Sequence, residues 1–465
     1  MLTADSRAVG PGSLFAALPG TKHDGRSFIM EAVQKGAVAI LSDHEAVIPT
    51  SVVALRAADP RILLAHLAAA CFPAPPAHIA AVTGTNGKTS TAQFVREIAS
   101  ALGHTAASIG TLGVIGPGLD DYGTLTTPDS VTLHHILGEL ATQGITHLCL
   151  EASSHGLVQA RLEALTIQAA GFTNLTRDHL DFHGTMESYY AAKARLFDEV
   201  LQPGGTAVIN ADVPEAADLA ARARKHGCQV ITYGLQGTEI SLHDIAAHGH
   251  GQDVTLSLFG KRVTVPLNIV GRFQVWNALC ALGLTIGLGL DGTQALAALP
   301  KLTGVRGRLQ HVGTHPCGAP VFIDYAHTPD ALETVLKALR PHVGAGGRLI
   351  TVFGCGGNRD RGKRPVMGGL AQRLADLAIV TDDNPRFEDA ATIRTEILSG
   401  CAPQPPMREI ADREQAIRLA VGQLRAGDIL VIAGKGHEPG QIVGDTVLPF
   451  DDGAIARGFL EQAAA

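Results

Sequence analysis

Hydrophobic and polar positions along the chain change period repeatedly, as they do when strands and helices alternate. Residues 79–82 form a continuous apolar run typical of a buried strand, and Phe94, Val95, Ile98 and Leu102 repeat at helical spacing. This strand–helix order continues to about residue 304 and predicts a parallel sheet with crossover helices. Its strands are expected at 79–83, 146–151, 169–173 and 205–210.

Two other patterns lie beside and within this region. Before it, short apolar runs and a helix-like segment at 25–36 lead to the proline-rich residues 71–77, which stop a helix and indicate a linker. Within it, residues 239–270 alternate apolar and polar positions and predict a small antiparallel insertion, followed by a helix at 275–288. We therefore expect a domain boundary near residue 77.

A third strand–helix region follows Arg308. Each of its apolar runs ends in a polar, glycine-bearing or acidic loop, and doubly wound sheets bind ligands beyond the carboxyl ends of their strands. The runs lie at 320–323, 348–353, 377–381 and 428–433, with helices at 330–339 and 365–374. The whole pattern predicts an α/β protein of three domains, at 1–77, 78–304 and 305–465.

Composition excludes several classes of protein. The chain has 465 residues, 46% hydrophobic and 17% charged, which suits a globular protein rather than a disordered one. Its 37 basic and 44 acidic residues include no basic run, so we expect no nucleic-acid partner. The N-terminus lacks an apolar signal core, the most apolar stretch is too short to span a bilayer, and the seven cysteines show no C-x-x-C spacing. We expect a cytoplasmic protein with reduced thiols and no membrane insertion.

The loop after the first strand of the central region has the composition of a phosphate-binding loop. In the segment Thr-Gly-Thr-Asn-Gly-Lys-Thr at 83–89, glycines let backbone N–H groups approach a phosphate, and the next helix offers its positive N-terminus. Lys88 can reach the outer phosphates of ATP, and the Thr89 hydroxyl can coordinate Mg²⁺. Val82 replaces the first glycine of the common G-x-x-x-x-G-K-[ST] pattern, and the alternative is a turn without a ligand. Lys-Thr at the helix start favours an ATP site.

Three further side chains have both a chemical and an ordinary interpretation. Glu151, at the end of an apolar run, is well placed for Mg²⁺, or it is a helix N-terminal acid before serine caps. His179 could ligate a second metal or contact phosphate, or it is a satisfied core histidine. Lys193 lies on an apolar helix with Phe197 at i+4 and, taken alone, is a snorkelling lysine.

Cationic residues mark two loops of the third region. Arg359, Arg361, Lys363 and Arg364 crowd one loop. A solvated charged loop is the ordinary interpretation, but glycines on both sides favour anion binding. Arg386, in the segment Asp-Asn-Pro-Arg, has a guanidinium suited to clamping a carboxylate.

Together these motifs resemble one family, the Mur ligases of peptidoglycan assembly, and within it the branch that adds the third residue of the peptide. Single motifs are weak, but their order and spacing are specific and span nearly the whole chain. They are GTNGKT (84–89), ExSSHGLxQxR (151–161), TNLxxDHLDxHG (173–184), DYAHTPD (324–330), GCGGxRDxGKRP (354–365), DNPR (383–386) and GKGHE (434–438).

The resemblance implies a function for each domain and a reaction. The implied domains are a small N-terminal α/β domain for the UDP-sugar, a central P-loop-type parallel-sheet ATPase domain, and a C-terminal Rossmann-like domain for the incoming amino acid. ATP and Mg²⁺ would activate the D-glutamate carboxylate of UDP-N-acetylmuramoyl-L-alanyl-D-glutamate as an acyl phosphate, which an amine attacks to give an amide. The substrates would be small molecules, and we expect a monomer whose domains move on binding.

The resemblance also assigns residues. It implies catalysis by Lys88, Glu151, His179 and Lys193, and Mg²⁺ sites formed by Thr89, Glu151, His179 and a carbamylated Lys193. The implied ATP contacts are Gly84, Thr85, Asn86, Gly87, Lys88, Thr89, Ser90, Asn277, Arg308 and Asp324. The implied contacts to the UDP-sugar dipeptide are Ser6, Thr21, Lys22, His23, Thr126, Thr127, Ser153, Gln159 and Arg161.

The Asp-Asn-Pro-Arg motif indicates which amino acid is added. In the resembling enzymes it marks meso-2,6-diaminopimelate, which is lysine with an extra carboxylate. Arg386 would pair with that carboxylate, while Asn384 and Glu438 face an ammonium. Lysine would be rejected by about 10⁴-fold, because the site's own polar groups would lose their partners. The implied contacts are Arg359, Asp383, Asn384, Pro385, Arg386, Gly434 and Glu438.

Three other interpretations stay open. A folylpolyglutamate synthase shares the ATP loop, although the DNPR and GKGHE loops argue against it. A P-loop switch protein would hydrolyse ATP to drive a partner, without any amino acid. A nucleotide-binding scaffold would show no turnover, and Lys88, Glu151 and His179 argue against it.

Overall fold

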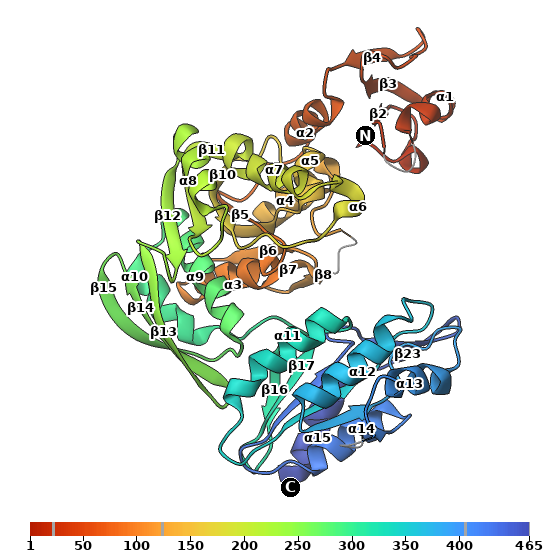
Figure 1. The fold of residues 1–465 in the computed structure, drawn as a ribbon. Coiled ribbons are helices and arrows are strands. Elements are labelled where there is room, and N and C mark those ends of the chain that lie inside the picture. The colour runs from red at the N-terminus through yellow and green to blue at the C-terminus, as the bar shows by residue number, and fades with distance from the viewer. Residues whose placement is uncertain (21–23, 122–124, 404–406, 465) are drawn as a thin grey trace. The chain divides into compact units, whose positions relative to one another are not determined.

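The computed structural model describes residues 1–20, 24–121, 125–403 and 407–464 (Figure 1). The chain divides into two compact units. The first unit comprises residues 1–241, 258–260 and 277–298, and the second unit comprises 242–257, 261–276 and 299–465. Thr21, Lys22 and His23, which we expected to contact the UDP-sugar, lie outside the described residues.

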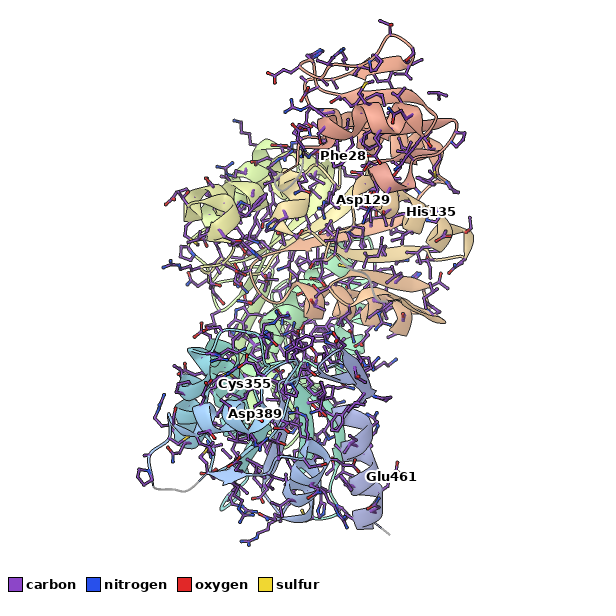
Figure 2. All side chains as sticks on the ribbon, turned by 90° about the vertical axis from the view of Figure 1, so that its right-hand side faces the viewer. Phe28, Asp129, His135, Cys355, Asp389 and Glu461 are labelled. Carbon is purple, nitrogen blue, oxygen red and sulfur yellow. The ribbon has the colours of Figure 1, made fainter. Side chains whose placement is uncertain are left out.

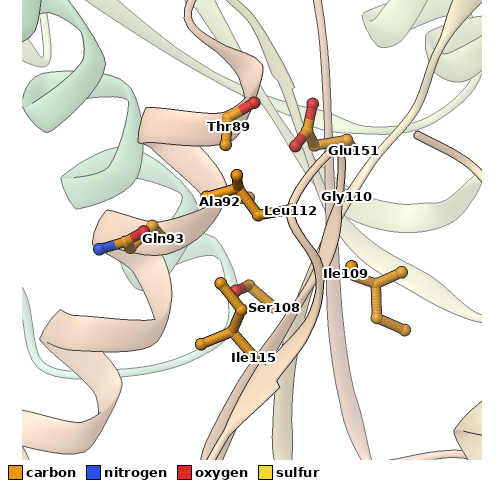
Figure 3. A pocket seen from close by; sticks show the side chains of 10 residues that line it. Thr89, Ala92, Gln93, Ser108, Ile109, Gly110, Leu112, Ile115 and Glu151 are labelled. Carbon is orange, nitrogen blue, oxygen red and sulfur yellow. The ribbon is translucent and has the colours of Figure 1, made fainter. Parts of the chain in front are cut away.

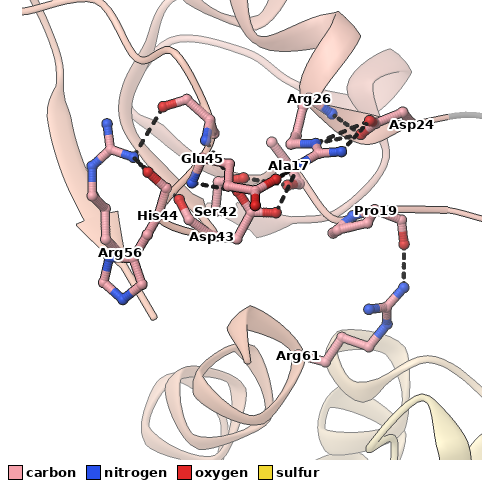
Figure 4. Close-up of polar contacts among 11 residues, drawn as sticks. Ala17, Pro19, Asp24, Arg26, Ser42, Asp43, His44, Glu45, Arg56 and Arg61 are labelled. Atoms are coloured by element: carbon pink, nitrogen blue, oxygen red, sulfur yellow. Dashed lines mark hydrogen bonds and ion pairs between the residues drawn. The ribbon is translucent and has the colours of Figure 1, made fainter. Parts of the chain in front are cut away.

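The chain begins with a small parallel sheet in the order β1-β2-β3-β4. Phe15 and Ile40 of the sheet pack against Ile29 of α1. Arg26 fixes one end of the sheet by pairing with Asp24 and Asp43 (Figure 4). The elements are β1 (Leu2–Thr3), η1 (Ser6–Ala8), β2 (Ser13–Ala16), η2 (Gly25–Phe28), α1 (Ile29–Gln34), β3 (Ala37–Ser42), β4 (Val53–Arg56) and α2 (Pro60–Cys71).

The central sheet of the first unit runs in the order β12-β11-β10-β5-β9-β6-β7-β8. It is parallel from β12 to β6, and its last two pairings are antiparallel. The elements are β5 (His78–Thr83), α3 (Lys88–Ala101), β6 (Ala106–Gly110), β7 (Gly113–Gly116), β8 (Leu119–Asp121), α4 (Ser130–Thr142), β9 (His147–Glu151), α5 (Ser154–Val158), β10 (Ile167–Phe172), α6 (Leu180–His183), α7 (Met186–Arg195), η3 (Leu196–Val200), β11 (Leu201–Asn210), α8 (Ala216–Lys225) and β12 (Gln229–Gly234).

The register of this sheet brings the chemical motifs to one edge. Val82 of β5 lies opposite Glu151 of β9, and Thr83 lies opposite Phe172 of β10. Because parallel strands end at the same edge, the glycine loop, Glu151 and the segment that begins at Thr173 become neighbours. The parallel sheet predicted from the apolar runs is confirmed, with β10 beginning two residues earlier than expected.

The segment with alternating polarity, predicted as a small antiparallel insertion, forms three strands. Two-residue connections join them, which is the usual link between antiparallel neighbours. A long helix follows and starts three residues before its expected position. The elements are β13 (Ile240–His248), β14 (Gly251–Leu258), β15 (Lys261–Leu267), α9 (Arg272–Gly287), α10 (Gly292–Ala298) and η4 (Leu299–Lys301).

The second unit has a doubly wound sheet in the order β16-β17-β21-β18-β19-β20. All of its pairings except β16–β17 are parallel. Side chains alternate between its faces, so Phe322 packs with α11 and α12, while Val321 and Ile323 pack with α14 and α15. The elements are β16 (Gln310–Thr314), β17 (Pro320–Asp324), α11 (Pro329–Leu339), η5 (Arg340–His342), β18 (Leu349–Phe353), α12 (Lys363–Leu374), β19 (Leu377–Val380), α13 (Ala390–Leu398), β20 (Arg408–Glu409), α14 (Arg413–Gly422), β21 (Ile429–Ala433), β22 (Gly440–Val443), β23 (Thr446–Pro449) and α15 (Asp452–Ala464).

Two properties of the whole chain complete the description. Every cysteine is free. Cys355 lies in the core beside α12, and Asp389 is the N-cap of α13 (Figure 2). Over the described ranges, none of the helices is both long and apolar enough to cross a membrane.

Candidate active site

The glycine loop between β5 and α3 has the backbone that the sequence predicts. Gly84 and Gly87 have φ values of +149° and +87°, which L side chains rarely adopt. A Cβ at Gly87 would come within 2.3 Å of the Asn277 Oδ1, so Asn277 of α9 packs directly against the loop. Lys88 is the first residue of α3, so the loop ends at a helix N-terminus.

The segment after β10 holds this loop in shape. The Thr173 hydroxyl donates to the Asn86 carbonyl (2.6 Å), and the Asn86 N–H donates to the Asn174 Oδ1 (2.9 Å). The Thr85 N–H donates to the Asn174 carbonyl (2.9 Å). The loop is therefore fixed by its neighbour in the sheet.

Two lysines converge on one carbonyl of the loop. Lys88 Nζ donates to the Gly84 oxygen at 2.9 Å, and Lys193 Nζ donates to the same oxygen at 2.8 Å. Lys193 is 1% exposed and lies 4.3 Å from the centre of the Tyr189 ring. Burial, and then the charge of Lys88, lower the pKa of Lys193 to about 6. Lys193 is thus a buried, mostly neutral amine at pH 7 and not a snorkelling side chain.

Glu151 lies at the end of β9, and the residue is 1% exposed. The Thr111 N–H donates to its Oε1 (2.9 Å), and the Thr89 hydroxyl bonds to it as well. Burial raises the pKa of Glu151, against the lowering effect of the Lys88 charge and of these hydrogen bonds. Gly110 leaves room for the carboxylate, because a Cβ there would lie 2.0 Å from Oε1.

Thr89 and Glu151 meet at one end of a small cavity (Figure 3). The cavity has a volume of about 10 Å³, which is the space of about one water molecule. Ile109, Leu112 and Ile115 form its apolar walls. A hydroxyl and a carboxylate are oxygen donors of the kind that Mg²⁺ prefers, so these two residues fit a magnesium ion.

His179 has a half-exposed side chain. Its φ is +51°, and its Nε2 lies 3.5 Å from the Asp178 Oδ2. The His179 ring is 6.0 Å from the ring of Tyr189, the residue that also contacts Lys193. Over the described ranges, no group of three or more histidine, cysteine, aspartate or glutamate side chains is spaced to hold a metal ion.

Four of the residues assigned to the UDP-sugar dipeptide form one hydrogen-bonded group beside Glu151. The buried Thr127 hydroxyl donates to the Glu151 carbonyl (2.7 Å) and contacts the Ser153 hydroxyl (3.0 Å). Arg161 donates to the Thr127 carbonyl and, at 2.7 Å, to the Gln159 Oε1. The Thr126 hydroxyl lies 3.1 Å from that of Thr111, which itself contacts Glu151.

Ser6 is the member of the UDP-sugar set that lies in the N-terminal sheet. It is half-buried in η1, and its carbonyl accepts a hydrogen bond from Lys35 Nζ (3.0 Å). Asp5 caps this turn by accepting from the Arg7 N–H (2.9 Å). The turn is thus locally ordered by the Asp-Ser-Arg sequence itself.

The second unit carries the remaining assigned residues. Asp324, at the end of β17, accepts from the Leu309 N–H (2.7 Å) and the Ala326 N–H (2.8 Å). Burial raises the pKa of Asp324 to about 6, although the charge of Arg308 acts in the opposite direction. Arg308 lies over the Tyr325 ring at 5.1 Å. Arg308 and Asp324 are therefore brought together.

The Asp-Asn-Pro-Arg and Gly-Lys-Gly-His-Glu loops meet at the carboxyl edge of this second sheet. Asn384 Nδ2 donates to the Glu438 Oε2 (2.8 Å). Gly434 has a φ of +117°, and a Cβ there would lie 2.6 Å from the Asp383 Oδ2. That Asp383 oxygen is buried and, within the described part of the chain, lacks a hydrogen-bond partner.

Arg386 has a left-handed backbone conformation, which is unusual for a residue other than glycine. Its φ is +52°, and its Nη1 donates to the Gly357 carbonyl (3.0 Å). Arg359 lies on that same glycine-bearing loop and is exposed. A Cβ at Gly356 would contact both arginines, at 2.8 Å from the Arg386 Nη1 and 3.9 Å from the Arg359 Cγ. Both arginine side chains therefore approach the same glycine.

The prediction that the basic loop binds an anion is wrong for Arg364. Arg364 is fully buried and pairs with Glu388 (3.0 Å) and Glu396 (2.6 Å). Arg361 also pairs with Glu388, at 2.9 Å. Arg364 has no exposed face with which to meet a ligand, because it faces Glu388 in the loop before α13 and Glu396 of α13.

Sequence reasoning missed several residues that shape both groups. Tyr189 lies one helical turn before Lys193, and this i, i+4 spacing could have indicated the contact. Lys435 was visible between two glycines of the last motif, yet its complete burial was not. Thr111 gave no signal, because its shorter contact to Glu151 is made by the backbone N–H.

The sheet order and the glycine loop define the first unit as a phosphate-loop nucleotide-binding fold joined to a small N-terminal sheet. Three family models match the chain: "Mur ligase family, catalytic domain" at residues 1–73, "Mur ligase middle domain" at 82–285 and "Mur ligase, glutamate ligase domain" at 307–436. The chain belongs to the Mur ligase family.

Individual relatives show which Mur ligases the chain is similar to. The chain is 52% identical to the UDP-N-acetylmuramoyl-L-alanyl-D-glutamate–2,6-diaminopimelate ligase of Agrobacterium fabrum, over 99% of this chain and 93% of the relative. It is 51% identical to the ligase of the same name from Caulobacter vibrioides, over 100% and 96%. A solved structure of a ligase of that name matches with a TM-score of 0.79 and 36% identity, over 100% of this chain and 95% of that one.

A more distant structure shares the fold. Folylpolyglutamate synthase of Mycobacterium tuberculosis, complexed with ADP, matches with a TM-score of 0.63 at 19% identity, over 86% of this chain and 94% of that one. An identity this low shows a shared fold alone. The mixed α/β architecture with mainly parallel sheets, expected from the sequence, is confirmed.

Proposed function

We propose that this chain is an ATP-dependent ligase that adds meso-2,6-diaminopimelate to UDP-N-acetylmuramoyl-L-alanyl-D-glutamate, the MurE-type step of peptidoglycan synthesis. The observation that carries the proposal is sequence identity of 51–52%, over almost the full length, to ligases named for this reaction. The arrangement of charges in the two residue groups supports it. The three-domain division at 77 and 304 and a monomeric, cytoplasmic protein remain part of the proposal.

The chemistry explains why the first unit needs a phosphate loop. A carboxylate is a poor electrophile at neutral pH, so ATP transfers its γ-phosphoryl group to the D-glutamate carboxylate, and an acyl phosphate forms. The amine then attacks the acyl carbon, and the tetrahedral intermediate expels phosphate to leave an amide. Two anions approach each other in the first step, and Lys88 at the loop lowers their repulsion. Mg²⁺ held by Thr89 and Glu151 would add further charge neutralisation there.

Lys193 is suited to a modification that changes its charge. A carbamate forms when a neutral amine attacks CO₂, with a new N–C bond and the loss of one proton. The lowered pKa of Lys193 supplies that neutral amine near pH 7. The carbamate is anionic and, together with His179, would provide a ligand for a second Mg²⁺. Incorporation of ¹³C-labelled bicarbonate, followed by NMR, tests this part, and Lys193→Ala should lose the carbamate signal.

The second unit supplies selectivity for the amino acid. Arg386 and Arg359, which both approach Gly356, match the carboxylates of diaminopimelate, because a guanidinium binds a carboxylate through two parallel hydrogen bonds. Glu438, held by Asn384, offers an acceptor to an ammonium group. The uncommitted carboxylate oxygen of Asp383 lies beside them.

The group around Glu151 is suited to the UDP-sugar dipeptide. Thr127, Ser153, Gln159 and Arg161 place two hydroxyls, an amide and a guanidinium next to the acid that would hold Mg²⁺. An acceptor carboxylate bound there would lie close to the phosphate loop, as phosphoryl transfer requires. Ser6, Thr21, Lys22 and His23 would contact the nucleotide end.

The experiment that tests the proposed function is a phosphate-release assay with each substrate omitted in turn. Phosphate should appear only when ATP, Mg²⁺, the UDP-sugar dipeptide and diaminopimelate are all present, and mass spectrometry should find the UDP-sugar tripeptide. Steady ATP hydrolysis without an amino acid would instead support a P-loop switch protein. Product formed with tetrahydrofolate and glutamate would support a folylpolyglutamate synthase.

A further inference from the structure

A fully buried ammonium group connects the two loops that we assign to diaminopimelate. Lys435 follows β21 and is 0% exposed. Its Nζ donates to the Asn384 Oδ1 (2.9 Å) and to the Gly440 carbonyl, and it lies 3.4 Å from the Glu438 Oε2. An ammonium has three donors and no acceptor, so these contacts use its whole hydrogen-bonding capacity.

Lys435 fixes which way the Asn384 amide points. The Asn384 Oδ1 receives hydrogen bonds from Lys435 Nζ and from the Ile442 N–H (3.0 Å). Both partners can only donate, so the atom that they share must be the carbonyl oxygen of the amide. The amide nitrogen is then forced toward the Glu438 Oε2, to which it donates at 2.8 Å.

This orientation leaves Glu438 with one committed and one available oxygen. Within the described residues, the hydrogen bonds to the Glu438 carboxylate from Asn384 and Lys435 both end on Oε2. The side chain is 32% exposed, so Oε1 can face a ligand. A cationic amine is the ligand chemistry that this oxygen fits.

The same lysine ties the β22–β23 hairpin to the Asp-Asn-Pro-Arg segment. Its bond to Gly440 lies at the start of β22, and the Gln441 Nε2 donates to the Asp383 carbonyl (2.7 Å). The Arg386 N–H donates to the Ile442 carbonyl (3.0 Å), which continues the connection. A shift at Lys435 would therefore move both the acidic and the basic parts of the site.

We propose that Lys435 is a positioning residue for recognition of the diamino acid. It holds the Asn384 amide in one orientation and thereby presents the Glu438 carboxylate to the substrate ammonium, without touching the substrate itself. The inference rests on the proposed function, because it assumes that this loop pair binds diaminopimelate. A purely structural lysine would instead affect all substrates alike.

The test is a kinetic comparison of Lys435→Met with Lys337→Met. Methionine keeps the unbranched apolar stem and removes the donors, while Lys337 is an exposed lysine of the same unit, paired with Glu333. Lys435→Met should raise KM for diaminopimelate about 10- to 100-fold, the usual cost of losing a charged hydrogen-bond partner, and change KM for ATP and the UDP-sugar dipeptide less than about 2-fold. Lys337→Met should match the wild type in all three.

A double-mutant cycle separates positioning from general packing. If Lys435 acts through Asn384, then Lys435→Met adds little in an Asn384→Ala background, because the amide it orients is gone. Additive effects, or equal changes in all three KM values, would overturn the proposal. Should Lys435→Met not fold, as judged by its melting temperature, Lys435→Arg carries the test: it keeps the charge but cannot place three donors at the same points, and an unchanged KM for diaminopimelate would refute positioning.

Failure of the proposed function would give a different result from failure of the Lys435 proposal. If the proposed function is wrong, the wild-type protein itself forms no UDP-sugar tripeptide from diaminopimelate, so no variant is needed to show it. If the wild type forms it and folded Lys435→Met has a normal KM for diaminopimelate, only the assignment of Lys435 is wrong.

Discussion

The residues assigned to ATP in the first unit and those assigned to diaminopimelate in the second unit are held by different kinds of contact. At the phosphate loop of the first unit, backbone atoms hold the charged side chains: two lysines share the Gly84 carbonyl, and the Thr111 N–H holds Glu151. In the second unit, side chains hold the carboxylate that we assign to the substrate ammonium, because Asn384 and Lys435 both donate to Glu438. Phosphate chemistry is the same for every amine, so a backbone frame is sufficient for it. A choice between similar amino acids needs side chains of defined identity.

This difference predicts that substitutions in the two units affect different kinetic quantities. Changes at the phosphate loop should lower the rate for every amino acid equally. Changes at the second unit's loops should alter the preference for diaminopimelate over lysine. The first two predictions below measure both quantities, so each of them can contradict the division.

The largest effect is expected for Lys88→Ala. Loss of the cation at the phosphate loop should lower kcat/KM by about 10³-fold or more, because preorganised charge supplies much of the stabilisation of phosphoryl transfer. The ratio of diaminopimelate to lysine turnover should stay at the wild-type value. A phosphate-release assay with both amino acids measures this. A changed ratio would contradict the separation of the two roles.

Arg386→Ala should affect preference more than rate. We expect KM for diaminopimelate to rise about 10²-fold, because a carboxylate loses its two-pronged partner, while lysine turnover changes little. Arg386→Lys should recover only part of this, since an ammonium cannot bind in the same way. Equal losses for both amino acids would place Arg386 in the general machinery instead.

Gly434→Ala tests the packing between the two loops with a smaller effect. Gly434 and Gly346 both have positive φ values, of +117° and +73°, but a Cβ at Gly434 meets the Asp383 carboxylate, whereas nothing lies within 4 Å of one at Gly346. Both variants should lose about 1 kcal/mol of stability from backbone strain. Only Gly434→Ala should raise KM for diaminopimelate as well, about 10-fold by displacing Asp383. Identical kinetics for the two would show that Asp383 has no part in recognition.

The smallest effect concerns the dependence of stability on pH. The pKa of Asp324 is raised to about 6, so between about pH 4 and pH 6 the folded protein holds a proton that the unfolded chain has lost. The contribution of Asp324 to stability is therefore present at low pH and is lost as pH rises through 6. The melting temperature of the wild type relative to Asp324→Asn should fall by a few degrees between pH 4.5 and pH 7.5. A constant difference would contradict the raised pKa.

Regular elements with a strong pattern could be predicted from the sequence. The apolar run of β5, the helical spacing of α3 and the glycines between them indicated the phosphate loop within a residue of its position. Short strands such as β7, β20 and the β22–β23 hairpin were not predicted. They have two to four residues each, so their pattern is too short to distinguish from a loop.

The candidate site divides in the same way. Lys88 and Glu151 could be found because Lys88 begins the helix after the glycine loop and Glu151 ends a strand. The burial of Lys193 could not, because its partner Gly84 lies 109 positions earlier in the chain. Lys435 likewise meets Asn384 across 51 positions. Long-range contacts of this kind depend on sheet order, which local periodicity does not encode.

One measurement tests the central claim most directly: kcat/KM of the purified protein for meso-diaminopimelate and for lysine, with saturating ATP, Mg²⁺ and UDP-N-acetylmuramoyl-L-alanyl-D-glutamate. Diaminopimelate should be preferred by about 10⁴-fold, because lysine leaves Arg386 without its carboxylate. Comparable values for the two amino acids would contradict the assignment of the second unit's loops to diaminopimelate.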